Sequence, residues 1–211
     1  MSDSGSIFTG QIHVIQLSNV KAFLVECTGG SVLVDTGSSD EDAKKILEKL
    51  KEIGKDPTSV RVCIITHHHN RHVGGLRTLK KVCKFSVFAH KNDAGKIFAK
   101  TNTPVDRELS GGEIIPFCGG IHVIYTPGHT FGTIVLYLPA FKALIAGDTL
   151  MGARGRLLLP PPESCEDPRF HLESIRKLES LDFDIVFVSH GDDILEQGKI
   201  KLLKLLESLK K

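Results

Sequence analysis

Short apolar runs separated by turn residues dominate the first third of the chain. β-Branched residues are concentrated in these runs, and the Thr-Gly-Gly at 28–30 separates two of them, which is typical of strands joined by a tight turn. The run at 60–66 is almost continuously apolar, a pattern that favours a strand buried on both faces. The strands predicted in this region are 11–17, 20–27, 31–37 and 60–66.

Helical spacing of apolar residues follows the third of these strands and recurs later. Residues 38–56 carry Ser and Asp at the start, acids in the first turn and a glycine near the end, which are helix start and stop signals. Residues 151–168 are rich in Pro, Gly and Arg and predict a loop. Further helices are predicted at 74–82, 92–100, 168–181 and 194–211, and further strands at 85–90, 113–117, 121–126, 132–138, 142–147 and 184–189.

The order of these elements predicts an α/β fold. Residues 23–37 and 134–150 each have the pattern of strand, turn and strand, and each contains Asp-Thr close to its end. Consecutive strand pairs in both halves, with helices between them, favour two sheets that carry helices on their outer faces. No linker interrupts the pattern, so we expect a single domain over 1–211.

Composition narrows the class of protein. Apolar residues make up 41% and charged residues 25% of the 211 residues, as in ordinary globular proteins, and a net charge of +2 gives little support for binding nucleic acid. There is no apolar run of membrane-spanning length and no basic, apolar leader, so we expect a cytoplasmic protein that does not enter a membrane. In that compartment the five cysteines are predicted to be free thiols.

Side chains that bind metals follow four separate apolar strands. His67, His69 and His72 follow strand 60–66, His129 follows 121–126, Asp148 follows 142–147, and His190 follows 184–189. Strand ends at one edge of a sheet converge, and imidazole nitrogens and carboxylates are ligands that zinc prefers. His67 and His69 lie two apart on an extended segment and can chelate one ion. His129 would complete three ligands and leave a position open for water, as in catalytic zinc sites.

These motifs in this order resemble the metallo-β-lactamase superfamily of metal-dependent hydrolases. The segments that carry the resemblance are LVDTG, THHHNRH followed by GG, TPGHT, AGDT and SHGD, which span most of the chain from about 12 to 210. The resemblance implies a four-layer αββα sandwich. It implies one metal on His67, His69 and His129, and a second on the motif aspartate, His72 and His190, with Asp148 bridging. Asp35 would be the buried acid behind this site.

The sequence departs from the superfamily motif at one position, where Arg71 stands in place of the aspartate. Arginine stays protonated and has no lone pair, so it cannot bind a metal. We therefore expect one firmly held zinc, with a second site that is weak or absent. Arg71 either binds an anionic substrate group or the developing oxyanion, or it points to solvent or pairs with an acid in a weakened enzyme.

Other candidate residues lie near the motifs. Arg154 and Arg156, in the loop after Asp148, are further candidates for binding a phosphate or carboxylate. His68 and Asn70 occupy free motif positions and are expected to pack beside the site. The remaining histidines, which match no motif position, are His13, His90, His122 and His171.

The leading hypothesis is a hydrolase that uses zinc-activated water on a small-molecule substrate. Asp148 would hold that water or accept its proton. The bond could be an ester, thioester, lactone, β-lactam or phosphodiester. Glyoxalase II enzymes of the superfamily carry an added C-terminal helical domain, and the short segment after His190 argues against their substrate.

Two alternatives remain open. One is an oxidoreductase similar to the persulfide dioxygenases of the superfamily, with iron held by His67, His129 and Asp148. The other is a degenerate binding protein, which Arg71 alone would motivate. The oligomeric state cannot be inferred from these patterns.

Overall fold

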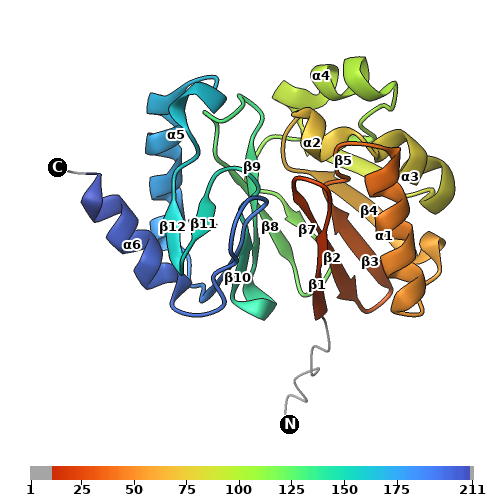
Figure 1. Ribbon diagram of the computed structural model, residues 1–211, viewed down its shortest axis with the longest axis horizontal. Helices are drawn as coiled ribbons and strands as arrows, with labels where there is room; N and C mark the ends of the chain where they lie inside the picture. The colour runs from red at the N-terminus through yellow and green to blue at the C-terminus, as the bar shows by residue number, and fades with distance from the viewer. Residues whose placement is uncertain (1–10, 210–211) are drawn as a thin grey trace, which may run out of the picture.

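The computed structural model describes residues 11–209, in which two β-sheets lie face to face between two sets of helices (Figure 1). The first sheet contains, in spatial order, β1 (Gln11–Gln16), β2 (Lys21–Cys27), β3 (Gly30–Val34), β4 (Val60–Ile65), β5 (Ser86–His90) and β6 (Arg107–Leu109). The second contains β13 (Ile185–Phe187), β10 (Ala143–Ile145), β9 (Ile134–Leu138), β8 (Ile121–Tyr125) and β7 (Ile114–Ile115). A separate hairpin consists of β11 (Met151–Ala153) and β12 (Arg156–Leu158).

Helices cover the outer face of each sheet, as Figure 1 shows with α1 and α3 on the right and α5 and α6 on the left. The helices are α1 (Asp40–Glu52), α2 (Asn70–Val73), α3 (Leu76–Cys83), α4 (Lys91–Thr101), α5 (Pro168–Ile175) and α6 (Gly198–Ser208). Buried apolar residues form three clusters, one under α1, α3 and α4, one between the sheets, and one under α5 and α6. The predicted four-layer αββα sandwich is confirmed.

The first sheet brings several loops to one edge because half of it is parallel. β3, β4, β5 and β6 pair in parallel, whereas β1, β2 and β3 pair antiparallel. The residues after β3, β4 and β5 therefore leave the sheet on the same side. Parallel pairing of β10 with β13 does the same in the second sheet. The two sets of loops meet at the edge of the sandwich.

The helix α1 illustrates how local sequence sets the elements. The Ser39 side chain accepts a hydrogen bond from the Asp42 N–H, which caps the first turn. Three acids lie in that first turn and two lysines in the last, which suits the helix dipole. Ala43, Ile46 and Leu50 are buried at helical spacing, so one face of α1 packs on the first sheet.

Some boundaries differ from the sequence-based expectation. The predicted loop 151–168 contains the hairpin β11–β12, and its short strands escape detection because Gly152 and Gly155 weaken the strand pattern. The strand predicted at 184–189 is only Ile185–Phe187, and the last helix begins at Gly198 rather than at 194. The helix predicted at 168–181 ends at Ile175 and continues as a 3-10 turn.

The prediction of five free thiols is wrong for two of them. Cys27, at the end of β2, and Cys118, in the turn before β8, form a disulfide that joins the two sheets. The pair is 91 residues apart, so no spacing motif marks it in the sequence. Cys63, Cys83 and Cys165 are free. Among residues 11–209 there is no helix with both the length and the apolar character to cross a bilayer.

Candidate metal centre

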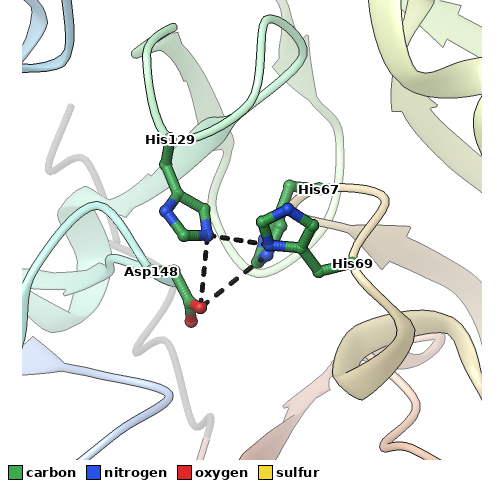
Figure 2. A group of neighbouring side chains, drawn as sticks. All are labelled: His67, His69, His129 and Asp148. Carbon is green, nitrogen blue, oxygen red and sulfur yellow. Dashed lines mark hydrogen bonds and ion pairs between the residues drawn. The ribbon is translucent and has the colours of Figure 1, made fainter. Parts of the chain in front are cut away.

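Three histidines and one aspartate from three loops converge at the edge of the sandwich (Figure 2). Ligand atoms of His67, His69, His129 and Asp148 all lie within 4.8 Å of one another. His129 Nε2 is 3.0 Å from His69 Nδ1 and 3.4 Å from Asp148 Oδ2. His67 Nε2 is 3.8 Å from the same carboxylate oxygen. The predicted three-histidine set is therefore brought together, with Asp148 beside it.

A second group shares Asp148. Ligand atoms of His72, Asp148 and His190 also lie within 4.8 Å of one another. His72 Nε2 is 3.2 Å from Asp148 Oδ1, and His190 Nε2 is 3.4 Å from Asp148 Oδ2. Asp148 is thus common to both groups.

Asp35 fixes the orientation of His72 from behind. It is fully buried, and its carboxylate accepts hydrogen bonds from the backbone N–H and hydroxyl of Thr66, each at 2.8 Å. The remaining contact is with His72 Nδ1, at 2.7 Å, so the Nε2 of the ring points toward Asp148. Asp35 adopts a left-handed backbone conformation, with φ of 62°, that aspartate tolerates better than most residues. It therefore acts through His72, as a carboxylate behind a histidine ligand does.

A second buried acid, Asp93 at the start of α4, joins the loops that carry the histidines. Its Oδ2 accepts hydrogen bonds from the His68 N–H at 2.8 Å and from the Thr130 hydroxyl at 2.7 Å. A Cβ atom on Gly132 would lie 2.3 Å from the Asp93 carboxyl carbon, so only glycine permits this approach. No sequence motif singles out Asp93, although it also follows a strand predicted at 85–90.

The pKa shifts of these side chains favour the binding of a cation. Burial, together with the charge of His72, lowers the pKa of His67 well below its ordinary value. Burial and the neighbouring His129 lower the pKa of His69 to about 4. Their ring nitrogens therefore carry lone pairs at neutral pH. Burial alone would raise the pKa of Asp148, but the surrounding histidines, His72 first, hold it well below its ordinary value.

The pKa of His72 shifts in the opposite direction to those of His67 and His69. Burial lowers its pKa, but the charges of Asp148 and Asp35 outweigh burial and raise it to about 10. The negative charges of the two carboxylates favour the imidazolium form of the ring that lies between them. A metal at the second group would have to displace this proton.

Unpaired polar atoms in the cluster fit a metal ion. His67 Nε2, His72 Nε2 and Asp148 Oδ1 are buried without a hydrogen-bond partner. Buried polar atoms rarely stay unpaired, because each costs about 1–3 kcal/mol. Nitrogen and carboxylate donors of this kind suit zinc or iron. The residues present therefore fit a divalent metal.

Arg71 lies at the mouth of this cluster, exposed on the short helix α2. The cavity above the cluster has a volume of about 620 Å³, and its lining includes Arg71, His72, His190 and Asp148. Between residues 11 and 209, no carboxylate forms an ion pair with Arg71. Arg71 therefore lines the same cavity as the second group, and no carboxylate of the described residues pairs with its guanidinium.

The remaining candidate residues lie partly at the cavity and partly away from it. Arg154 and Arg156 do not line the cavity. Arg156 instead borders a separate hollow beside α6, and Arg154 lies in the tight turn of the β11–β12 hairpin. His68 is buried with its Nδ1 3.0 Å from Asp93 Oδ2, in agreement with a packing role. Asn70 is exposed and lines the cavity.

Two residues outside the sequence motifs pack behind His129. The thiol sulfur of Cys165 is 3.7 Å from His129 Nδ1, on the side away from the cluster. His171 is buried, and burial lowers its pKa to about 4. A Cβ atom on Gly128 would lie 2.2 Å from the backbone of His171, so the loop that carries His129 packs closely against α5. Neither residue follows a strand, and no sequence signal marks them. The other histidines without a motif position, His13, His90 and His122, are not in the two groups.

One known protein family matches most of the chain. Residues 16–190 match the model of the metallo-beta-lactamase superfamily. The chain belongs to the metallo-β-lactamase superfamily. Solved structures of the superfamily have the same fold. A metallo-beta-lactamase family protein from Thermus thermophilus superposes with a TM-score of 0.73 at 21% identity, over 95% of this chain and 79% of that chain. A metallo-beta-lactamase from Cronobacter sakazakii gives a TM-score of 0.72 at 20% identity, over 94% of this chain and 90% of that chain.

Curated relatives of the chain include proteins named as hydrolases of acyl compounds. A hydroxyacylglutathione hydrolase of Synechococcus sp. (strain JA-3-3Ab) is 37% identical over 124 residues, which are 57% of this chain and 46% of the relative. An atrochrysone carboxyl ACP thioesterase of Aspergillus fumigatus is 23% identical over 186 residues, which are 88% of this chain and 55% of the relative. The chain thus spans about half the length of the curated relatives it matches.

Proposed function

We propose that the protein is a metal-dependent hydrolase of acyl thioesters. The observation that carries the proposal is the convergence of four ligand atoms within 4.8 Å, in which His67 Nε2 is buried and unpaired. Such a set has no role in folding that would offset the cost of leaving buried nitrogens without partners. A catalytic ion is the simplest way to satisfy it.

His67, His69 and His129 would hold the metal, which we propose is zinc. When bound in a site with an open position, zinc lowers the pKa of a water ligand to about 7 and polarises a scissile carbonyl. Thr66 and Cys165 lie against the outer nitrogens of two of these rings, 3.1 Å from His67 Nδ1 and 3.7 Å from His129 Nδ1. These contacts orient the rings toward the common point.

Asp148 is the group that would accept the proton of the attacking water. Its carboxylate faces the cavity between the two groups, and its lowered pKa keeps it ionised at neutral pH. His190, 3.4 Å from Asp148 Oδ2, is less deeply placed and can take up the proton from that oxygen. The second group would thereby serve in proton transfer when it holds no ion.

Arg71 would provide positive charge on the other side of the cavity. Its guanidinium has no acidic partner within the described chain, so it is free to donate to an anion. A developing oxyanion or a carboxylate of the substrate would accept those hydrogen bonds. Arg71 would then partly replace the charge that the superfamily supplies through its second ion.

The choice of a thioester rests on the named relatives. One group hydrolyses hydroxyacylglutathione and another relative is a thioesterase. Thioesters also suit a single-metal centre, because a thiolate is a better leaving group than an amine and needs less stabilisation from a second ion. β-Lactams, lactones and phosphodiesters are the substrates to compare.

A substrate panel tests this proposal. The protein is stripped with a chelator, reloaded with one equivalent of zinc, and assayed with an acyl thioester, an aryl ester, a lactone, a β-lactam and a phosphodiester. We expect thioester hydrolysis that is lost on chelation and returns with zinc, with kcat/KM at least tenfold above that of the other classes, about 1.4 kcal/mol of selectivity. Preference for the β-lactam or phosphodiester, or activity unchanged by chelation, would overturn it.

A further inference from the structure

A second hollow lies beside the metal cavity, on the side of α3 and α4. This hollow has a volume of about 570 Å³, and it shares Asn70 and Lys100 with the metal cavity. Because the same two side chains line both, the hollows adjoin across α2 and the end of α4. Each volume lies in the range of ordinary ligand sites, so together they can receive an elongated molecule.

Two uncompensated cations face the second hollow. Arg77, on α3, and Lys100, near the end of α4, both line it. No ion pair links either side chain to a carboxylate in the range 11–209. Asp40 also lines the hollow, but its carboxylate accepts a hydrogen bond from the Thr78 hydroxyl. The two positive charges of Arg77 and Lys100 exceed the single negative charge of Asp40, so the hollow favours an anion.

Lys100 links the hollow to the metal centre. Its Nζ donates a hydrogen bond of 3.0 Å to the backbone oxygen of His68, which lies between His67 and His69. The ammonium group is therefore fixed against the loop that carries two candidate metal ligands. Two of its three N–H donors stay free, because an ammonium has three and the His68 oxygen takes one.

We propose that the second hollow is a binding subsite for an anionic group of the substrate, held by Arg77 and Lys100. The acyl group would react at the metal centre while a phosphate or carboxylate on the remainder of the molecule passes Asn70 and reaches the cations. The substrate class is then an elongated thioester with an anionic group remote from the scissile bond. This inference rests on the proposed function for the identity of the reacting bond, although the anion site itself does not.

Paired thioesters test the subsite by turnover. Acetyl-coenzyme A carries phosphates, lactoylglutathione carries carboxylates, and S-acetyl-N-acetylcysteamine is neutral. The double variant Arg77→Ala/Lys100→Ala is compared with the wild type and with Lys81→Ala and Lys91→Ala. The two control lysines are exposed on the same helices and line neither hollow. We expect the ratio of kcat/KM for the better anionic thioester over the neutral one to fall about tenfold in the double variant and to be unchanged in both controls.

Binding measurements separate this inference from the proposed function. Calorimetric titration with desulfo-coenzyme A and with S-methylglutathione needs no hydrolysis, and these probes lack a thiol that could bind the metal. A dissociation constant weakened about tenfold in the double variant alone supports the subsite even if no thioester is hydrolysed. The identity of the probe that binds shows whether the subsite takes a phosphate or a carboxylate. Binding of neither probe to the wild type, or equal loss in the controls, overturns the inference.

Discussion

The Nδ1 of His69 and the Nε2 of His129 lie 3.0 Å apart, although 60 residues separate them in the chain. Two ring nitrogens at this distance are satisfied by one shared proton or by one cation. The ring of His67 lies 4.7 Å from each of the two rings, centroid to centroid, and stands nearly perpendicular to both. Three rings that meet edge to face around one point can present their nitrogens to a single metal ion.

Replacement of His129 should therefore weaken metal binding strongly. His129→Ala leaves two histidines in the first group, too few for a stable catalytic zinc site. We expect affinity for zinc to fall by at least about 100-fold, with kcat/KM falling in parallel. Competition with a chromophoric chelator measures the affinity. His122→Ala is the matched control, because His122 packs against Tyr137 outside the centre and its loss should leave zinc binding unchanged. Unaltered zinc affinity in His129→Ala would remove His129 from the site.

Replacement of Arg71 should restore the second metal. Arg71→Asp puts a carboxylate beside His72, His190 and Asp148 and removes a repelling charge. We expect a second equivalent of zinc to bind. If Arg71 also binds an anion, turnover of an anionic thioester falls while metal uptake rises, whereas a merely weakened enzyme gains activity. Arg169→Asp makes the same change of charge at an exposed position outside the cavity. Unchanged stoichiometry in Arg71→Asp would contradict the placement of Arg71 beside the second group.

The metal-free protein should lose stability as pH rises. The pKa of His72 is raised from 6.5 to about 10 in the folded protein, so folding is favoured while His72 is protonated. This contribution is complete below about pH 6.5 and disappears as pH rises through about 10. Between about pH 7 and 9, chelator-treated protein should lose on the order of 2 kcal/mol in urea unfolding. His72→Gln should give a flatter profile over the same range, and a flat wild-type profile would refute the imidazolium between Asp35 and Asp148.

The buried carboxylate of Asp42, away from the metal centre, should make the folding stability depend on pH at acidic values. This carboxylate accepts hydrogen bonds from the backbone and hydroxyl of both Ser18 and Ser38, at 2.7 to 3.0 Å. Burial raises its pKa, but these four donors outweigh burial and lower it to about 2. The contribution to folding is therefore present above about pH 4 and lost as pH falls through about 2.

Asp42→Asn should cost about 2 kcal/mol of unfolding free energy at neutral pH, and the difference from wild type should shrink toward pH 2. Urea unfolding over this pH range measures it. Asp182→Asn, at an exposed residue paired with Lys142, should change stability by less than about 0.5 kcal/mol. Equal effects of the two substitutions would show that the serine hydrogen bonds do not stabilise the charge.

Sequence patterns predict the arrangement of the two sheets because several central strands are five to seven residues long and apolar. β2, β4 and β9 lie where the pattern places them, and the ligand residues follow strand ends that a parallel arrangement brings together. The αββα layers therefore follow from the alternation of strand pairs and helices.

Features that depend on tertiary contact could not be predicted in the same way. The disulfide of Cys27 with Cys118 joins residues that only the packing of the two sheets brings together. Asp93 and Lys100 reach the centre from α4, a helix with no motif of its own. The position of Arg156 beside α6 results from the β11–β12 hairpin, whose three-residue strands carry too few positions for a recognisable alternation.

The metal content of the purified protein tests the account most directly. The protein is dialysed after expression without added metal, and zinc and iron are counted per chain by elemental analysis. One tightly held equivalent of zinc is the predicted result, since His67, His69 and His129 would form a complete ligand set, whereas the second group shares its cavity with Arg71. No bound metal would contradict the assignment of the cluster, and two tightly held equivalents would contradict the role given to Arg71.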